Sequence, residues 1–476
     1  MLFRSEPGTY RISAPIRLQG QNFALDGGTK ATIHRTPKTT ETSIFLLTNV
    51  QHARISRFFL EGEFDGSASS TGSNPLIQIG AGAGSDDDSI SEDIEISGNH
   101  FFKGNLAGVL VEGRQGTIGT VKNRNIRIFD NRFEKVTTGV FIYKNASNVV
   151  VSGNYAQDTA VSGYAMDTRA ATDPKDTGPN EHIVIANNFS TRTGQAQGFI
   201  GHGVLVKGAN HDIVVSGNTM TDIGNARTTK ENYGILVTQD ASGNSPSNVT
   251  LRDNSIKEVT SGTTGSYAIY VLRGASKIKV FRNTMSGAKR GMTIGPCEDV
   301  LVADNAFANL ARLTDYPLTI GDATGAPRGL SVSNNNFSLG DGRAVTPIGF
   351  AGGARGTGIS HGSNHYAGFA KNALTMSAAP GFAPDAEPAV FAGSANYPGG
   401  NIPPMSGVSF SGRVPGAGTE DAAIATLDAP PAEKKLVVTA FVSGSGTVTV
   451  NLFNPTPEGI SASAQTYNLQ VFNMAR

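Results

Sequence analysis

Charged and aromatic residues recur just beyond a set of short apolar segments, and their types suit acid–base chemistry. The segments begin with glycine, as in Gly163-Tyr-Ala-Met and Gly203-Val-Leu-Val. When they are aligned on that residue, one column near their ends collects chemically active side chains: Glu112, Tyr143, Asp167, Lys207, Thr238 and Tyr270. Carboxylates serve as general acids and bases, and lysine and tyrosine serve as bases. The column is therefore our candidate site.

Further candidates lie near this column. Two residues beyond it stand Arg114, Asn145, Arg169 and Asp240. Three more flank the segments: His182, His202 and Tyr233. Extra chain length falls on both sides of the segments, at 112–123, 169–181, 190–202, 222–233, 238–248 and 256–266. Loops on both sides of one strand ladder predict the walls of a groove.

The segments belong to an internal repeat. Three alternating apolar residues, two small or polar residues and an asparagine recur, as in Ile94-Glu-Ile-Ser-Gly-Asn99. Nine such asparagines follow one another at intervals of 22 to 36 residues: Asn99, Asn131, Asn154, Asn188, Asn218, Asn254, Asn283, Asn305 and Asn335. Units of two or more short strands are typical of a solenoid. We interpret the asparagine as structural, because its amide can pair with the same amide one coil away.

Stacked coils would bring the column residues together. Equivalent positions of adjacent strands lie about 5 Å apart, so we expect Tyr143, Asp167 and Lys207 to be neighbours. Glu112 and Asp167 would be two strands apart, roughly 9–10 Å, at the upper edge of the separation for inverting glycoside hydrolysis. In that reaction these two carboxyl groups would be the acid and the base.

A second chemistry, β-elimination, fits the same column. A base removes the proton next to a uronate carboxylate, and Lys207, Tyr143 or a loop histidine could be that base. Arg169 and Arg114 would then hold the carboxylate. The chain has no tryptophan, which leaves tyrosines as the surfaces on which sugars would stack: Tyr143, Tyr233 and Tyr270.

The repeat resembles the right-handed parallel β-helix of the pectate-lyase-like superfamily over about residues 7–340. The resemblance includes the opening Pro7-Gly-Thr-Tyr-Arg-Ile12. Tyr164-Ala-Met-Asp167-Thr-Arg169 is also similar to the Tyr-x-x-Asp-Pro-His motif of mannuronan C5-epimerases, which share this fold. Thr168 stands where the motif has proline, and Arg169 stands where it has the histidine that serves as base.

The chain divides into three parts by composition. We expect the β-helix to span residues 1–345. Residues 346–404 are rich in glycine, alanine and proline, which indicates an irregular last coil and a linker. Alternating segments such as Gly446-Thr-Val-Thr-Val-Asn-Leu-Phe453 then predict a small antiparallel β-sandwich over 405–476. Its segments resemble C-terminal modules of phage tail proteins, which implies that it caps or trimerises the helix.

Composition excludes several classes of function. The net charge is zero, so the basic excess of a nucleic-acid binder is missing. No apolar run approaches the 18 or so residues of a membrane helix. The chain has one cysteine, Cys297, which gives neither a disulfide nor a cysteine-rich zinc site. We expect no required cofactor, although the acidic run Asp86-Asp-Asp-Ser-Ile-Ser-Glu-Asp93 could hold calcium through oxygen ligands. Its alternative interpretation is a solvated loop.

Together these observations predict an all-β chain, a right-handed parallel β-helix followed by a small antiparallel β-sandwich. The resemblance implies a tailspike-like homotrimer that works outside the cell or on a virion surface. Its expected function is to bind and cleave a bacterial surface polysaccharide as a lyase or glycoside hydrolase. Two alternatives stay open, namely a spike that binds a receptor without catalysis and an enzyme similar to the polysaccharide C5-epimerases.

Overall fold

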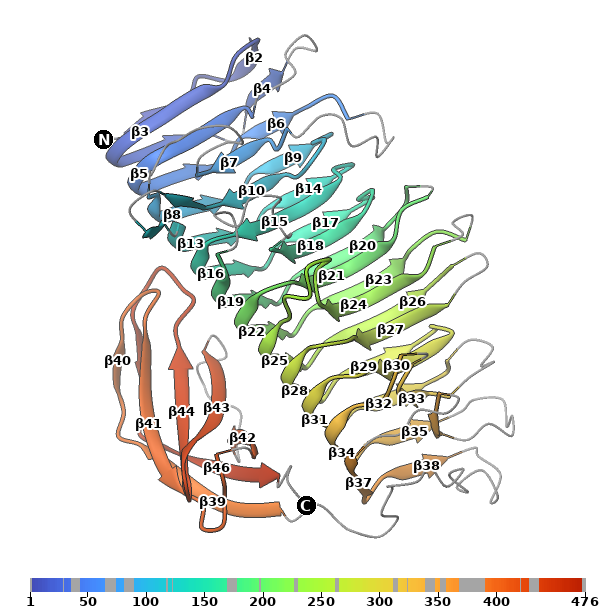
Figure 1. Cartoon of the computed structure of the whole chain (residues 1–476). Coiled ribbons are helices and arrows are strands. Elements are labelled where there is room, and N and C mark those ends of the chain that lie inside the picture. Colours follow the sequence, from blue (N-terminus) through green and yellow to red (C-terminus); the bar gives the residue numbers. More distant parts are fainter. Residues whose placement is uncertain are drawn as a thin grey trace.

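The computed structural model of the chain describes residues 2–28, 30–35, 43–64, 74–80, 90–116, 119–121, 123–168, 178–196, 198–226, 230–261, 265–310, 316–322, 324–338, 347–351, 357–367, 390–419, 421–427 and 436–472. The regular structure in these ranges is all strand. Within them, no helix could span a membrane. The described chain is a right-handed parallel β-helix with a small antiparallel β-module beside it (Figure 1), which confirms the predicted fold class.

Each coil of the solenoid contributes a strand to each of three parallel faces, which we number in chain order within a coil. Face 1 carries the strand before the repeated asparagine, face 2 the short strand after it, and face 3 the strand that begins with glycine. Face 1 consists of β1 (Leu2–Arg4), β3 (Ile16–Asp26), β5 (Phe45–Ser56), β8 (Glu92–Ser97), β13 (Asn123–Phe129), β16 (Ala146–Ser152), β19 (Asn180–Ala186), β22 (Asn210–Ser216), β25 (Ser247–Arg252), β28 (Ser276–Phe281), β31 (Glu298–Ala303), β34 (Arg328–Ser333) and β37 (Thr357–Gly362).

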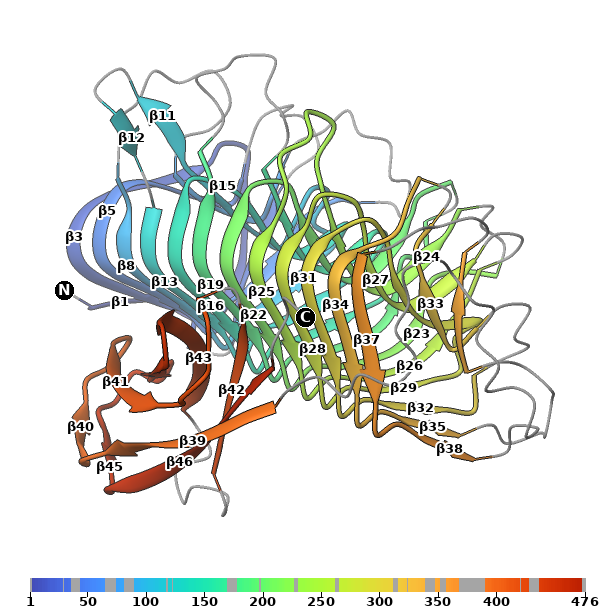
Figure 2. The same ribbon diagram turned by 60° about the horizontal axis from the view of Figure 1, so that its bottom comes forward.

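Faces 2 and 3 complete the coils (Figures 1 and 2). Face 2 consists of β2 (Gly8–Ile12), β4 (Ala31–Arg35), β6 (Phe59–Glu61), β9 (His100–Phe102), β14 (Arg132–Glu134), β17 (Tyr155–Gln157), β20 (Phe189–Thr193), β23 (Thr219–Ile223), β26 (Ser255–Val259), β29 (Thr284–Ser286), β32 (Ala306–Ala308), β35 (Asn336–Ser338) and β38 (His365–Ala367). Face 3 consists of β7 (Ile77–Ile79), β10 (Val109–Glu112), β15 (Thr138–Lys144), β18 (Ser162–Asp167), β21 (Gly201–Lys207), β24 (Asn232–Thr238), β27 (Ser266–Val271), β30 (Arg290–Ile294), β33 (Leu318–Ile320) and β36 (Ile348–Phe350). The long strands β3 and β5 run through both faces: their first residues belong to face 3 and their last residues to face 1. A two-stranded ribbon, β11 (Arg114–Gly116) with β12 (Gly119–Val121), follows β10.

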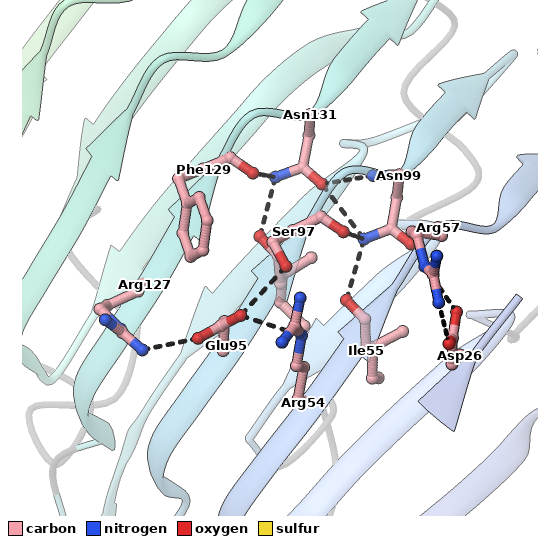
Figure 3. A network of polar contacts seen from close by, with 11 residues as sticks. Asp26, Arg54, Ile55, Arg57, Glu95, Ser97, Asn99, Arg127, Phe129 and Asn131 are labelled. Carbon is pink, nitrogen blue, oxygen red and sulfur yellow. Dashed lines mark hydrogen bonds and ion pairs between the residues drawn. The ribbon is translucent and has the colours of Figure 1, made fainter. Parts of the chain in front are cut away.

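The repeated asparagines form one continuous ladder inside the solenoid. Asn131 donates from its backbone nitrogen and from Nδ2 to Oδ1 of Asn154, both at 3.0 Å, and Nδ2 also donates to the carbonyl of Ile96 at 2.9 Å. The same pattern links Asn99 to Asn131 (Figure 3). It continues one coil beyond the predicted copies, because Asn335 donates to Oδ1 of Asn364 at 3.0 Å. The structural interpretation of the asparagines is therefore confirmed.

The glycine that begins most face 3 strands is required by packing at the corner. There, two consecutive residues point inward, and the first of them has no room for a side chain. A Cβ on Gly203 would lie 2.5 Å from Sδ of Met220 on face 2. In β27, Ala268 occupies the equivalent position, fully buried.

The C-terminal module is one curled antiparallel sheet with a short ribbon. Its six strands run in the order β42-β46-β39-β41-β44-β43, and the edge strands β42 and β43 approach each other. The strands are β39 (Val390–Tyr397), β41 (Gly407–Arg413), β42 (Ala422–Leu427), β43 (Val437–Gly444), β44 (Thr447–Phe453) and β46 (Gln465–Phe472), with β40 (Gly400–Ile402) and β45 (Ile460–Ala462) as the ribbon. The solenoid thus extends to β38, and the module begins at β39, inside the range predicted as linker.

The module lies along face 1 of the solenoid (Figures 1 and 2). Val150, Val184 and Val214, the outward middle residues of three face 1 strands, form an apolar cluster with Val437 of the module. A second cluster joins face 1 residues, Phe281 among them, to β42. Burying one such aliphatic side chain contributes roughly 1.5–3 kcal/mol, so these patches hold the two parts together.

The same row of outward middle residues is charged where the module is absent. Glu95 lies between Arg54 and Arg127, with contacts of 3.0 and 2.6 Å (Figure 3). The change from charged residues to valine along the row therefore marks where the module docks.

Candidate functional site

Face 3 presents three outward rows of side chains, and the strand register defines them. The stacked row lies at the start of the strands and contains Ser162, His202, Tyr233, Tyr267 and Arg290. The apolar row lies in the middle and contains Leu110, Phe141, Ala165, Leu205, Leu236 and Tyr270. The charged row lies at the end and contains Asp167, Lys207 and Thr238.

The stacked row is a pile of rings that follows the solenoid axis. His202 and Tyr233 stack with centroids 5.8 Å apart, and Tyr233 and Tyr267 stack at 5.3 Å. The guanidinium of Arg290 lies 4.9 Å from the Tyr267 centroid. Both faces of the Tyr233 ring are therefore covered by neighbours, and the expectation that Tyr233 stacks on a sugar stays a prediction without support from this placement.

Glu231 joins the two central tyrosines of this row. Its carboxylate accepts hydrogen bonds from the hydroxyls of Tyr233 and Tyr267, the latter at 3.4 Å. Arg290 donates to the Tyr267 hydroxyl. Burial and the hydrogen bond to Glu231 raise the pKa of Tyr233, so its hydroxyl stays a donor. The result is a connected network of an acid, two phenols and a guanidinium.

His202 is buried at the head of the stacked row. Its exposed fraction is 6%, and Nδ1 lies 3.2 Å from the hydroxyl of Ser162. Burial, with a smaller contribution from the charge of Lys207, lowers the pKa of His202 to about 3. A neutral, enclosed imidazole packs the stack, and this placement does not support the predicted contact with substrate.

The charged row contains the closest pair of predicted catalytic residues. Lys207 Nζ donates to Oδ2 of Asp167 at 3.1 Å, so the expectation that they are neighbours is confirmed. The Asp167 side chain is 5% exposed and that of Lys207 28% exposed. The ion pair therefore presents its lysine end to solvent and its carboxylate end to the protein.

Glu112 and Tyr143 lie differently from the predicted alignment. A β-bulge places Glu112 opposite Lys144 rather than Tyr143. The ring of Tyr143 instead lies 5.5 Å from Phe141 and 4.9 Å from Lys144 Nζ. Glu112 is buried, 8% exposed, and Tyr143 is half-buried. The predicted column is thus broken at this coil, because the bulge inserts one residue into β15.

Tyr270 belongs to the apolar row, opposite Leu236, and not to the charged row in which the alignment placed it. In β27 the residue at the glycine position is Ala268, so Tyr270 lies two residues before the position that continues the predicted column. The Tyr270 ring stacks on Tyr267 at 4.6 Å and is 8% exposed.

Three other candidates lie beyond or outside the face 3 strands. Asp240 accepts from the backbone nitrogens of Ser242 and Asn244 at 2.9 and 3.0 Å, which closes a turn after β24. Asn145 is fully buried at the corner between faces 3 and 1, with a φ of 51°. His182 lies in β19 on face 1, with a φ of 55° and Nε2 3.5 Å from Asp212. Asp240 thus has a structural role, and the substrate contacts expected of Asn145 and His182 stay predictions.

Tyr164 points into the core and Asp167 points outward. The Tyr164 hydroxyl donates to the carbonyls of Asn154 and Phe189 at 3.0 and 3.2 Å, and burial raises its pKa. The two matching residues of the epimerase-like motif therefore lie on opposite sides of β18. Arg169 lies outside the described residues, so the epimerase-like interpretation stays a prediction.

Several predicted residues cannot be placed. Arg169 lies outside the described residues, as do Asp86, Asp87 and Asp88 of the acidic run. Arg114 is in β11, and only its backbone is described. At the end of the acidic run, Asp93 lies 3.0 Å from Nδ1 of His52 and Glu92 pairs with Arg124. The calcium site and the roles of these arginines stay predictions.

The prediction placed Glu231 among the loop residues near the site and missed Tyr267 and Arg290. Tyr267 and Arg290 lie at the start of face 3 strands, a position that the alignment on glycine left out. Tyr233 and Tyr267 each precede a small residue that faces the core, and this shared position was the available signal.

Comparison with known proteins supports the fold. The family model of NosD, the periplasmic copper-binding protein, matches residues 109–338. None of the curated proteins matches the sequence. Among solved structures, the A-module of mannuronan C-5 epimerase AlgE4 from Azotobacter vinelandii superposes with a TM-score of 0.52 and 14% identity, over 81% of this chain and 91% of that module. The A-module of AlgE6 from the same organism gives 0.51 and 12%, over 81% and 91%.

A third match is the catalytic unit of a GH87 alpha-1,3-glucanase from Streptomyces thermodiastaticus, with a TM-score of 0.50 and 18% identity, over 81% of this chain and 64% of that unit. At these identities the shared property is the fold.

The described residues do not fit the copper that the NosD family name implies. Among them, no three histidine, cysteine, aspartate or glutamate side chains come together to hold a metal ion. Cys297 is buried, its Sγ contacts the carbonyl of Gly295 at 3.1 Å, and burial raises its pKa. Copper prefers thiolate, imidazole or thioether ligands grouped in one site. By the strands, their register and these structural matches, the chain is a right-handed parallel β-helix.

Proposed function

We propose that this chain binds an extended polysaccharide along face 3. The observation that carries the proposal is the order of the rows, in which the apolar row runs between the stacked row and the charged row. A sugar ring is apolar on its C–H faces and polar around its edge. Strands repeat every 4.7–4.9 Å or so, so a polymer along the axis meets a residue of the apolar row at successive coils.

The charged row is the proposed place of cleavage. Lys207 Nζ is engaged by Oδ2 of Asp167. A base for β-elimination must be free to take a proton from the substrate, so the pair favours hydrolysis. Asp167 would act as the base and Glu112 as the acid, two strands and roughly 9–10 Å apart. Lys207 would hold an acidic or hydroxyl group of the sugar.

The test is to incubate the protein with a panel of neutral and uronate-rich bacterial polysaccharides. The chain length of the polymer and the absorbance near 232 nm are measured over time. Hydrolysis predicts shorter chains without new absorbance, and Asp167→Asn and Glu112→Gln should each lower the rate at least about 100-fold. Asp158→Asn is the matched control, because Asp158 pairs with Arg192 on face 2. New absorbance would identify a lyase and overturn the assignment of hydrolysis. Binding without shortening would favour the alternative, a spike that recognises a polysaccharide without catalysis.

We also propose that the protein works outside the cell, or on a virion surface, as a homotrimer. The support is the sequence resemblance of its C-terminal segments to modules of phage tail proteins. Analytical ultracentrifugation of the full chain should give about three times the mass of 49.5 kDa. A monomer mass across micromolar concentrations would contradict the trimer.

A further inference from the structure

A cleft of about 400 Å³ lies between face 1 and the C-terminal module, away from the rows on face 3. Its solenoid side is built from the ends of β16, β19, β22 and β25 and the turns that follow. Its module side is built from Leu436, Val437, Pro455 and Thr456. The volume is within the range of small-molecule sites in proteins, about 300–1,000 Å³.

The solenoid side of this cleft carries Arg252, whose charge is weakly compensated. The side chain is 14% exposed, and its ion pair is Nη1 with Oδ2 of Asp253 at 3.3 Å. Asp253 is itself engaged more closely by Arg282, at 2.8 and 3.0 Å. Nε of Arg252 is enclosed and has no hydrogen-bond partner among the described residues. Burial lowers the pKa of this guanidinium, because the effect of desolvation is larger than that of the nearby Asp253 carboxylate.

Few other donors are available in the cleft. The backbone nitrogens of Gly153, Asn187 and Gly217 already donate to carbonyls of the next coil, so they do not donate to a ligand. Ser152 and Ser216 contribute hydroxyls from the same side as Arg252. The opposite side has the apolar Leu436, Val437 and Pro455 together with Thr456. Asp253 also lines the solenoid side, and its carboxylate is paired with Arg282. The cleft therefore pairs one guanidinium and hydroxyls with a largely apolar wall.

We propose that this cleft binds a sugar acid, with its carboxylate on Arg252 and the serine hydroxyls and its ring against the apolar wall. Guanidinium groups match carboxylates in geometry and form strong charge-assisted hydrogen bonds. The site is separate from face 3, so it stands whether or not that face cleaves a polymer. It would let the docked module sense or retain an acidic saccharide.

The experiment is isothermal titration of the full chain with glucuronate, inorganic sulfate and glucose. Glucuronate should bind, glucose should bind at least about 10-fold more weakly, and Arg252→Gln should weaken glucuronate about 10-fold or more. Arg127→Gln is the matched control, because Arg127 lies on the same face with the same 14% side-chain exposure. It should leave the affinity unchanged within about 2-fold.

A second variant keeps the proposal testable if Arg252→Gln unfolds. Ser216→Leu fills the cleft and leaves the guanidinium in place, so it should also abolish glucuronate binding. Circular dichroism checks the fold of each variant. The proposal is overturned if glucuronate does not bind, if it binds Arg252→Gln and Ser216→Leu as tightly as the parent, or if sulfate and glucuronate bind equally, which would mean that the ring contributes nothing.

Discussion

Lys207 and Asp167 occupy the same register position on adjacent strands of face 3, and Lys207 Nζ donates to Asp167 Oδ2 at 3.1 Å. The pair spans two coils that are 40 residues apart in the chain. It is the point where the predicted chemistry and the observed geometry agree most closely. It also limits that chemistry, since each group is engaged by the other.

Replacing only one residue of this ion pair should lower the free energy of unfolding more than replacing both residues. Lys207→Met leaves the nearly buried Asp167 carboxylate without its lysine, and we expect a loss of about 2–3 kcal/mol in the free energy of unfolding, reduced from the fully buried case because Lys207 is partly exposed. The double variant with Asp167→Asn should recover part of this loss. Urea unfolding measures both. Equal stabilities of the single and double variants would show that the pair contributes nothing.

The buried His202 should make the stability of the protein decrease as the pH falls below 6.5. Its pKa is lowered from 6.5 to about 3, so the unfolded chain binds more protons than the folded chain between these values. The stabilisation is present above pH 6.5 and is lost as the pH falls toward 3, by as much as about 4 kcal/mol. His202→Gln should flatten the pH profile of thermal unfolding over this window. His52→Gln, at an exposed histidine, should leave the profile unchanged.

Lys279 should make the stability of the protein depend on pH in the alkaline range. Its Nζ donates to the carbonyl of Ala440 at 2.6 Å, which joins face 1 to β43, and burial lowers its pKa from 10.5 to about 8. The docked state binds fewer protons than the unfolded state between pH 8 and 10.5, so stability rises with pH across this window. Below pH 8 the full cost of the buried charge remains, about 3 kcal/mol at most.

Lys279→Met should therefore remove this rise and leave a flat profile between pH 8 and 10. Differential scanning calorimetry would measure it, with the exposed Lys277→Met as the control. A rise that persists in Lys279→Met would assign it to another group.

The asparagine ladder should be among the most sensitive parts of the solenoid. Asn188 Oδ1 accepts from the backbone nitrogen and Nδ2 of Asn154, both at 3.0 Å, and its Nδ2 donates to the carbonyl of Val151 at 2.9 Å. Asn188→Ala leaves these buried groups unpaired, at a cost of about 1–3 kcal/mol each, and we expect a total of about 4 kcal/mol. Asn451→Ala, which removes one exposed hydrogen bond to Ser409, should cost less than about 1 kcal/mol. Chemical denaturation of both variants tests the difference.

Much of the fold was predictable because it is repeated. The repeated coils share the same asparagine and the same alternation of apolar residues. An error in assigning the strands of one coil can therefore be recognised by comparison with the other coils. The docking of the module also had a signal in the sequence. The middle residue of the face 1 strands changes from Glu95 and Arg127 to Val150, Val184 and Val214, and a strand with apolar residues on both sides is buried on both sides.

The site was less predictable because it depends on register. One residue of shift changes which side of a strand a side chain occupies. The bulge at Tyr143 places Glu112 opposite Lys144. With Ala268 at the glycine position, Tyr270 lies two residues before the predicted column, in the apolar row.

The sequence by itself determined the solenoid, the ladder at its corner and the pairing of Asp167 with Lys207, because each follows from a local pattern repeated at each coil. Only the tertiary structure decided that His202, Tyr233 and Tyr267 stack on one another, that Tyr164 points inward, and that the module covers face 1. These contacts join residues from different coils, or from solenoid and module. Their geometry is set by how turns and bulges offset neighbouring strands, and no short segment of the chain encodes that offset.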